Sequence, residues 1–249
     1  MNSKFSNMER SLEIMRDWYL RPPGSSILSW ENKEATRFLK TIRGKYLIQM
    51  GGETTLTHSA GSPIFYHIQL TSELTNNLLS IQIDWKKLPL LTGRIDVFVL
   101  VHVLEFISYP VTLIQEIFRA LKPAGRLFIF GFNPWSLSGL RKLFSIKQEV
   151  PWNGKFWSCE QVKRWLINFK YSISFSKTFC YGLPFKNKPN QRLHLINEMI
   201  GQVCFPTIGS IYLLAAKKEV YVPLCSRILW KKDPAIPQSI IKLTPSLKL

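Results

Sequence analysis

Three features in the middle of the chain predict an α/β fold built on a mostly parallel sheet with helices on both faces. Residues 96–101 form an apolar run without polar alternation, which is typical of a strand buried on both faces. An amphipathic stretch at 110–121 and a second apolar run at 126–130 follow it, and this order favours parallel strands joined by right-handed crossovers. Polar side chains come where the first run ends, at His102 and Glu105, and ligands of open α/β sheets bind at such strand ends.

Periodicity and turn residues place the other elements. Helices are expected at 8–20 and 29–42, and Gly44 ends the second of them. The remaining strands are expected at 45–50, 63–70, 79–83, 171–176 and 211–216, and the remaining helices at 157–169, with Ser158 as N-cap, and at 192–203. The sheet is therefore expected to have seven strands, of which the last is antiparallel and returns at the sheet edge.

The same pattern divides the chain into three parts. Residues 1–44 are expected to form an N-terminal helical cap, and residues 45–216 the α/β domain. Within that domain, 136–208 hold the insertions expected on the substrate side. Residues 217–249 are rich in proline and lysine, show little periodicity, and are interpreted as a basic C-terminal extension.

Length and composition narrow the class of protein. The 249 residues, 46% of them apolar, are enough for one large α/β domain with a sizeable core. The first twenty residues hold acidic side chains and no apolar core run, which argues against a signal peptide, and no stretch is long and apolar enough to span a bilayer. The four cysteines are widely spaced without metal-binding pairs, so we expect reduced thiols, no metal site and a cytoplasmic location.

The net charge of +17 is unevenly distributed along the chain. Residues 136–192 carry 11 Lys and Arg against 2 Asp and Glu, a net charge of +9, whereas residues 1–135 carry 15 against 11, a net charge of +4. A basic face attracts polyanions such as RNA or anionic lipid headgroups. A lysine-rich solubilising surface explains the same charges, and their spacing along the chain slightly favours that interpretation.

The element order and three segments resemble the class I S-adenosylmethionine-dependent methyltransferases, most closely the methyltransferase type 11 group. The segments are 83–90, where an aspartate precedes a Leu-Pro turn, 95–106, which holds the strand and the Leu-Glu-Phe that follows it, and 121–127, which reads Leu-Lys-Pro-Ala-Gly-Arg-Leu. The resemblance implies the Rossmann-like class I methyltransferase fold, methyl transfer to an unknown acceptor, and S-adenosylmethionine as cofactor.

The resemblance also implies roles for particular residues. Gly51 and Gly52 would form the turn after the first strand, where the absence of Cβ lets the backbone approach the methionine part of the cofactor. Asp84 would accept a hydrogen bond from the adenine amino group, with Trp85 beside the ring. His102 would lie at the end of the fourth strand, near the sulfonium and the substrate.

The first strand departs from the family pattern. Gln49 stands where the family has an acidic residue that contacts the cofactor, and no third glycine follows Gly51 and Gly52. The nearest candidate for the acid that holds the ribose hydroxyls is Glu73. An amide still forms hydrogen bonds, but it loses the charge assistance that makes such bonds roughly twice as strong.

Several candidate residues have a structural interpretation beside the functional one. His102 is either the general base, since its pKa class suits neutral pH, or a histidine satisfied at a strand end by backbone groups. Glu105 is either a base or substrate contact, or a favourable charge at a helix N-terminus. Asn133 and Trp135 either line the substrate side or form a turn before a helix capped by Ser136.

Three hypotheses of different classes remain open. The leading one is a methyltransferase that positions an acceptor for in-line attack on the methyl group of S-adenosylmethionine. The second is a catalytically inactive module on the same scaffold that binds RNA through residues 136–192. The third, a peripheral membrane protein held by basic charge, is the weakest because the sequence has no clean amphipathic basic helix.

Overall fold

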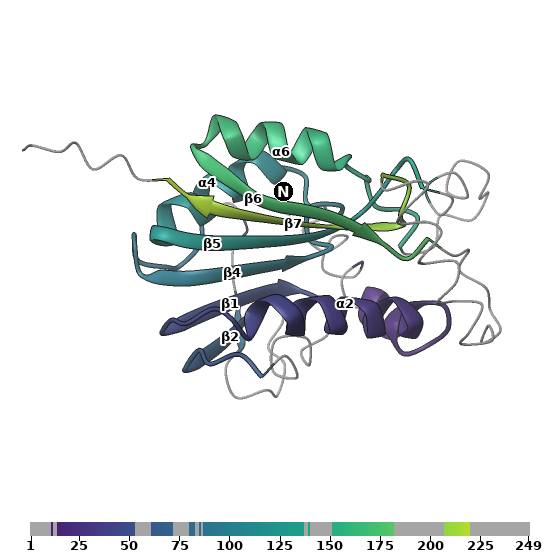
Figure 1. Ribbon diagram of the computed structural model, residues 1–249, viewed down its shortest axis with the longest axis horizontal. Coiled ribbons are helices and arrows are strands. Elements are labelled where there is room, and N and C mark those ends of the chain that lie inside the picture. Colours follow the sequence, from purple (N-terminus) through teal and green to yellow (C-terminus); the bar gives the residue numbers. More distant parts are fainter. Residues whose placement is uncertain are drawn as a thin grey trace, which may run out of the picture.

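A seven-stranded sheet forms the centre of the protein, which was analysed as a computed structural model. The structure describes residues 11, 14–52, 61–71, 80–82, 85, 87–136, 139, 151–181 and 207–219. The strand order is β3-β2-β1-β4-β5-β7-β6, and Figure 1 shows how the sheet separates α2 from α6. The strands are β1 (Tyr46–Gly51), β2 (Tyr66–Thr71), β3 (Ser80–Gln82), β4 (Ile95–Val101), β5 (Leu121–Phe132), β6 (Tyr171–Phe179) and β7 (Ile211–Lys218).

The first five strands are parallel, and β7 runs antiparallel to both of its neighbours. The seven-stranded, mostly parallel sheet predicted from the sequence is therefore confirmed. The last strand, however, does not lie at the edge: β7 is inserted between β5 and β6, and β6 is the edge strand. Burial gives the reason, because residues 211–216 are buried without alternation, whereas β6 has exposed positions along its length.

One face of the sheet is covered by α2 (Gly24–Leu39) and by the helical residues 14–19 that precede it. The buried side of α2 presents Ile27, Ala35 and Leu39 to the sheet. Their partners on the strands are the side chains that point to this face, namely Leu47, Val97, Val99, Val101, Phe128, Phe130, Ile211 and Leu213.

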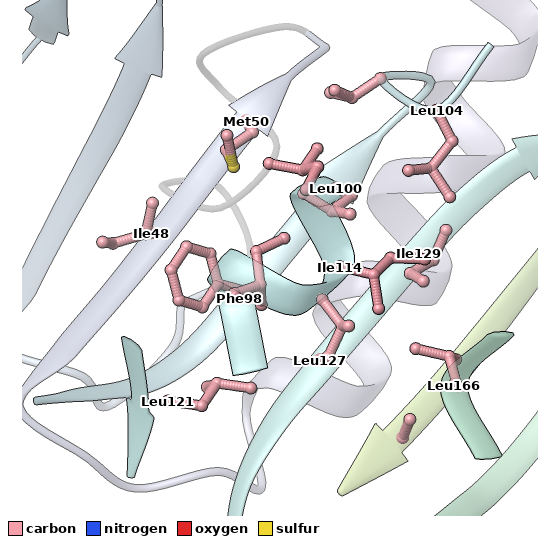
Figure 2. Close-up of a cluster of buried hydrophobic side chains, with 14 of the residues drawn as sticks. Ile48, Met50, Phe98, Leu100, Leu104, Ile114, Leu121, Leu127, Ile129 and Leu166 are labelled. Carbon is pink, nitrogen blue, oxygen red and sulfur yellow. The ribbon is translucent and has the colours of Figure 1, made fainter. Parts of the chain in front are cut away.

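The opposite face is covered by α4 (Pro110–Ala120) and α6 (Cys159–Asn168). The alternate residues of the same strands point here, so that Phe98 and Leu100 of β4 pack against Ile114 of α4 (Figure 2). Leu166 of α6 joins the same cluster. Because both faces of β4 are buried, its sequence has to be apolar without interruption, as the chain shows.

Most predicted elements are present, with shifted ends. Helix α4 and the Ser158 cap of α6 match their predictions, since the Ser158 side chain accepts a hydrogen bond from the backbone N–H of Gln161. Helix α2 begins at Gly24 instead of residue 29, and β5 begins at Leu121 instead of residue 126, where the strand pairs with Ile95 before a register shift. The helix expected at 192–203 and residues 220–249 of the C-terminal extension lie outside the described residues.

The division into a cap, a domain and an extension stays a prediction, although β7 continues past residue 216 to Lys218. Among the helices that the structure describes, none combines the length and the apolar character that a bilayer crossing needs.

Replacing Phe98 with alanine tests how much the doubly covered strand contributes to the fold. Phe98 is 0% exposed in the centre of β4, so its truncation is expected to lower the free energy of unfolding by about 3–5 kcal/mol. Phe65 is 83% exposed, and the matched change Phe65→Ala is expected to alter it by no more than about 0.5 kcal/mol. Urea denaturation of the two variants and the parent chain measures both changes, and a similar loss in the two would contradict the assigned core.

Candidate active site

The carboxyl ends of β1, β4 and β5 meet at one edge of the sheet, where the backbone takes unusual conformations. Gly51 and Gly52 have φ values of +71° and +68°, and His102, which follows β4 directly, has a φ of +52°. A Cβ on Gly51 would lie 2.4 Å from the carbonyl oxygen of Val101, and a Cβ on Gly52 would lie 2.7 Å from a methyl group of the same residue. Both glycines are therefore required where this turn packs against the end of β4.

The amide of Gln49 belongs to this turn. Its Nε2 donates a hydrogen bond to the carbonyl oxygen of Gly51 at 3.0 Å, and the residue is 2% exposed. Gln49 thus supports the conformation of the turn from within β1. A carboxylate could not make this contact, because it has no proton to donate to a carbonyl oxygen.

Next to this turn, His102 lies between two carboxylates. Its Nε2 is 2.7 Å from Oε1 of Glu31 on α2, and its Nδ1 is 3.2 Å from Oε1 of Glu105. The side chains of all three residues are at most 1% exposed. We call Glu31, His102 and Glu105 the buried ionic cluster.

Each of the two carboxylates also accepts a hydrogen bond from another group. The hydroxyl of Tyr19 donates to Oε2 of Glu31 at 3.0 Å, and the backbone N–H of Phe132 donates to Oε1 of Glu105 at 2.8 Å. The ring of Phe132 also stacks on the His102 imidazole, with centroids 3.9 Å apart. The cluster therefore ties the N-terminal helices to the ends of β4 and β5.

The geometry fixes the protonation of His102. An ionised carboxylate can only accept, so both ring nitrogens have to donate, and the ring that satisfies both contacts is the imidazolium. Burial alone would lower the pKa of His102, but the charges and hydrogen bonds of Glu31 and Glu105 outweigh it and raise the pKa to about 9. An imidazolium has no free lone pair, so His102 would have to lose a proton before it could act as a base, and its role as general base stays a prediction.

Asn133 and Trp135 continue the same edge beyond β5. The Asn133 side chain is 4% exposed, and its Nδ2 donates to the carbonyl oxygens of Thr207 and Gly209 at 2.7 and 2.9 Å. Its Oδ1 accepts from the backbone N–H of Trp135 at 3.1 Å, while the Trp135 side chain is 74% exposed. Asn133 thus fixes the walls of this edge, and the indole of Trp135 is available to a ligand.

Of the residues expected around the adenosine part of the cofactor, the structure describes Trp85 alone. Asp84 and Glu73 lie outside the described residues, so their cofactor contacts stay predictions. Trp85 is 2% exposed and packs in the hydrophobic cluster that contains Met50 and Leu88. Its ring offers little surface to a ligand in this arrangement, and its contact with adenine also stays a prediction.

Sequence reasoning missed Glu31 and Tyr19, which hold His102 from the N-terminal helices. A signal was present, because Glu31 falls four residues after Ile27 and four before Ala35. A charged residue on the buried stripe of a helix has to meet a partner inside the protein. In the part of the chain that the structure describes, no group of His, Cys, Asp and Glu is arranged to hold a metal ion.

The strand order and the polar strand ends define the fold of the class I S-adenosylmethionine-dependent methyltransferases. Comparison with known proteins agrees: residues 62–129 match the family model described as a methyltransferase domain. The chain is 26% identical over 200 residues to the uncharacterized protein YafS of Escherichia coli K12, covering 79% of this chain and 78% of that one.

Solved structures show the same fold. An S-adenosylmethionine-dependent methyltransferase from Thermotoga maritima superposes with a TM-score of 0.62 at 14% identity, covering 87% of this chain and 100% of that one. The geranyl diphosphate C-methyltransferase of Streptomyces coelicolor, solved with S-adenosyl-L-homocysteine, gives a TM-score of 0.51 at 12% identity, with 76% of this chain and 79% of that one covered. The methyltransferase fold predicted from the sequence is confirmed.

The stability of the protein is expected to fall as the pH rises through the titration of His102. Its folded pKa of about 9 lies above the ordinary histidine pKa of 6.5, so its contribution is fully present below about pH 6.5 and is lost as the pH approaches 9. One pKa unit corresponds to about 1.4 kcal/mol, which makes the change roughly 3 kcal/mol. Urea denaturation at a series of pH values measures the free energy of unfolding.

Two variants test whether His102 is the group responsible for this fall of stability with pH. Glu31→Gln removes the closer negative charge and is expected to flatten the fall between pH 6.5 and 9. Glu160→Gln removes an exposed carboxylate that pairs with Lys163, far from the buried ionic cluster in the chain, and it is expected to leave the fall unchanged. Equal slopes in the two variants would show that His102 does not titrate as described.

Proposed function

We propose that this chain is a cytoplasmic S-adenosylmethionine-dependent methyltransferase whose reaction takes place at the carboxyl ends of β1, β4 and β5. The turn at Gly51 and Gly52 is the observation that carries the proposal. Its positive φ values and its packing against Val101 place bare backbone at the strand end where ligands of open α/β sheets bind. In the described part of the chain, Cys159 is a free thiol, in keeping with a reducing compartment.

The charge of the buried ionic cluster supports the same proposal. Two carboxylates around one imidazolium leave a net negative charge at the ends of β4 and β5. Oε2 of Glu105 is buried and has no hydrogen-bond partner among the described residues. A low-dielectric site with excess negative charge favours a cationic ligand, and the sulfonium of S-adenosylmethionine is a cation.

S-adenosylmethionine, when bound, supplies a methyl group that is already activated toward nucleophiles. The residues of this chain then have to bind the cofactor and the methyl acceptor, orient them toward each other, and exclude water. The Gly51–Gly52 turn supports the methionine part, Asp84 accepts from the adenine amino group, and Asn133 and Trp135 shape the acceptor side. Positioning of this kind can supply a large share of the rate, so the reaction does not require His102 to act as a base.

Isothermal titration of the full chain with S-adenosylmethionine tests the proposal. Measurable heat is expected for the parent chain, with about tenfold or greater weakening in Asp84→Ala, because the adenine amino group loses a charged acceptor. Gly51→Ala is expected to abolish binding, since its Cβ would meet the carbonyl oxygen of Val101.

Gly93→Ala is the matched control for the glycine substitution. Gly93 has a similar φ of +65°, but a Cβ there would meet nothing within 4 Å, and the residue lies near the amino end of β4. Unfolding of each variant by urea separates loss of binding from loss of the fold. The absence of heat across the accessible concentration range, with a folded parent chain, would overturn the proposal.

RNA binding is a second candidate function, carried by residues 136–192. The observation that favours it is the pairing of cations with aromatic rings, since Lys155 lies 4.1 Å from the centroid of Trp157, and Trp152 packs against Phe156. Aromatic rings beside positive charges are the groups that stack bases and hold phosphates.

Fluorescence anisotropy with a labelled single-stranded RNA measures this second candidate. Binding that weakens steeply between about 50 and 200 mM salt is expected if phosphate contacts supply the affinity. Salt-dependent RNA binding without any response to S-adenosylmethionine would favour the inactive RNA-binding module. Absent or salt-insensitive binding would reject it.

A further inference from the structure

A cavity of about 540 Å³ opens beside the buried ionic cluster, at the carboxyl ends of β5 and β6. Asn133 and Trp135 line it after β5, and Thr178 and Tyr181 line it at the end of β6. The first turn of α6 and Thr207 before β7 complete its described walls. Its volume is within the range of small-molecule sites, about 300–1,000 Å³.

The cavity and the cluster are linked through the backbone of β5. Phe132 stacks on His102 and donates its N–H to Glu105, and the next residue, Asn133, lines the cavity. The side chain of Asn133 is held at both ends by backbone groups, so this wall is fixed. A molecule in the cavity would therefore lie next to the strand ends where the proposed reaction takes place.

Two cationic side chains line the cavity. Lys163 of α6 is 2.7 Å from Oε1 of Glu160, whose side chain is 75% exposed, and Lys177 of β6 is 2.7 Å from Oε1 of the buried Glu34. The Lys163 side chain is 23% exposed, but its partner Glu160 reaches into solvent, so this ion pair contributes little to stability and an anionic ligand can replace the Glu160 carboxylate. Lys177 is slightly more exposed, at 29%, but its partner Glu34 is buried and holds it in place. Lys163 is thus the cation whose carboxylate partner a ligand replaces more easily.

The cavity also offers aromatic surface. Trp135 is 74% exposed at its rim, and Tyr181 lies on the opposite strand end, where its hydroxyl is 2.8 Å from Oγ1 of Thr178. An exposed indole is costly to leave in water and stacks well on a flat ring. The lining therefore combines a stacking surface with a positive charge whose carboxylate partner a ligand can displace.

We propose that this cavity holds the methyl acceptor, and that the acceptor is a flat aromatic molecule carrying an acidic group. The ring lies against Trp135, and the acidic group faces Lys163. This inference rests on the proposed methyltransferase function. A small carboxylic acid and a nucleotide share this chemistry.

The acidic group serves for recognition, and a different atom of the acceptor takes the methyl group. The lone pair of that nucleophilic nitrogen, oxygen or carbon forms the new bond to the methyl carbon. The carbon–sulfur bond breaks, and its electron pair stays on sulfur. Any proton on the nucleophile passes to water, so atoms and charges balance without an oxidant or reductant.

Ligand-observed NMR of the full chain with matched probes tests the inference. Indole-3-acetate is compared with the neutral indole-3-acetamide, and uridine monophosphate with uridine. At least one acid is expected to bind about tenfold more tightly than its neutral partner, a difference of about 1.4 kcal/mol. The pair that shows the difference tells a small acid from a nucleotide.

Three variants assign that preference to the cavity. Lys163→Gln is expected to remove most of the tenfold difference, whereas Arg164→Gln, on the neighbouring residue that does not line the cavity, is expected to retain it. Ser176→Trp fills the cavity from the exposed side of β6 and is expected to abolish binding of both acids. No binding of either acid, equal binding of acid and neutral probe, or a difference that survives Lys163→Gln would overturn the inference.

Titration with S-adenosylmethionine separates this inference from the proposed function. If the cofactor binds and neither acid does, the acceptor assignment is wrong and the methyltransferase function stands. If an acid binds through Lys163 and the cofactor does not bind, the function is wrong, and the assignment of this ligand as a methyl acceptor is overturned with it.

Discussion

The contact of His102 with Glu31 and Glu105 is the interaction on which the arrangement of this edge depends. It joins three parts of the chain that no local pattern brings together: α2, the turn after β4, and the end of β5. Charges removed from water are costly unless they are paired and hydrogen-bonded. Here each carboxylate also accepts from a second group, the Tyr19 hydroxyl for Glu31 and the Phe132 N–H for Glu105, so most of the cost is offset.

The buried ionic cluster limits what His102 can do in the reaction. An imidazolium between two carboxylates holds its protons firmly, so His102 serves this site first by fixing α2 and the strand ends. His102 directly follows Val101, which packs against the glycine turn, and Phe132 links the cluster to the cavity that Asn133 lines. A methyltransferase that relies on positioning needs such a rigid edge, because small displacements of the reacting atoms cost much of the rate.

The sequence predicts the centre of the fold well, and the reason is physical. Strand β4 is buried on both faces, and α4 has one buried stripe, so their apolar patterns are unambiguous. The position of β7 between β5 and β6 depends on long-range pairing, which a local pattern does not encode. The early start of α2 also depends on tertiary packing, which overrides the poor helix signals of Pro23 and Gly24.

The site is less predictable than the fold. His102 and Glu105 could be located because polar residues at the end of a buried strand are conspicuous. Their partner Glu31 lies 71 residues away from His102 in the chain, and only its position on an apolar helix stripe indicated that it is buried. The positive φ of His102, which aims the ring at that partner, has no signature in a residue that is not glycine.

A crystal structure of the full chain soaked with S-adenosyl-L-homocysteine would show whether a cofactor binds at these strand ends. We expect density for the adenosyl and homocysteine parts along the Gly51–Gly52 turn and the end of β4, with His102 still between Glu31 and Glu105. Clear density for the protein with none for the ligand at millimolar concentration, or a ligand bound away from these strand ends, would contradict it.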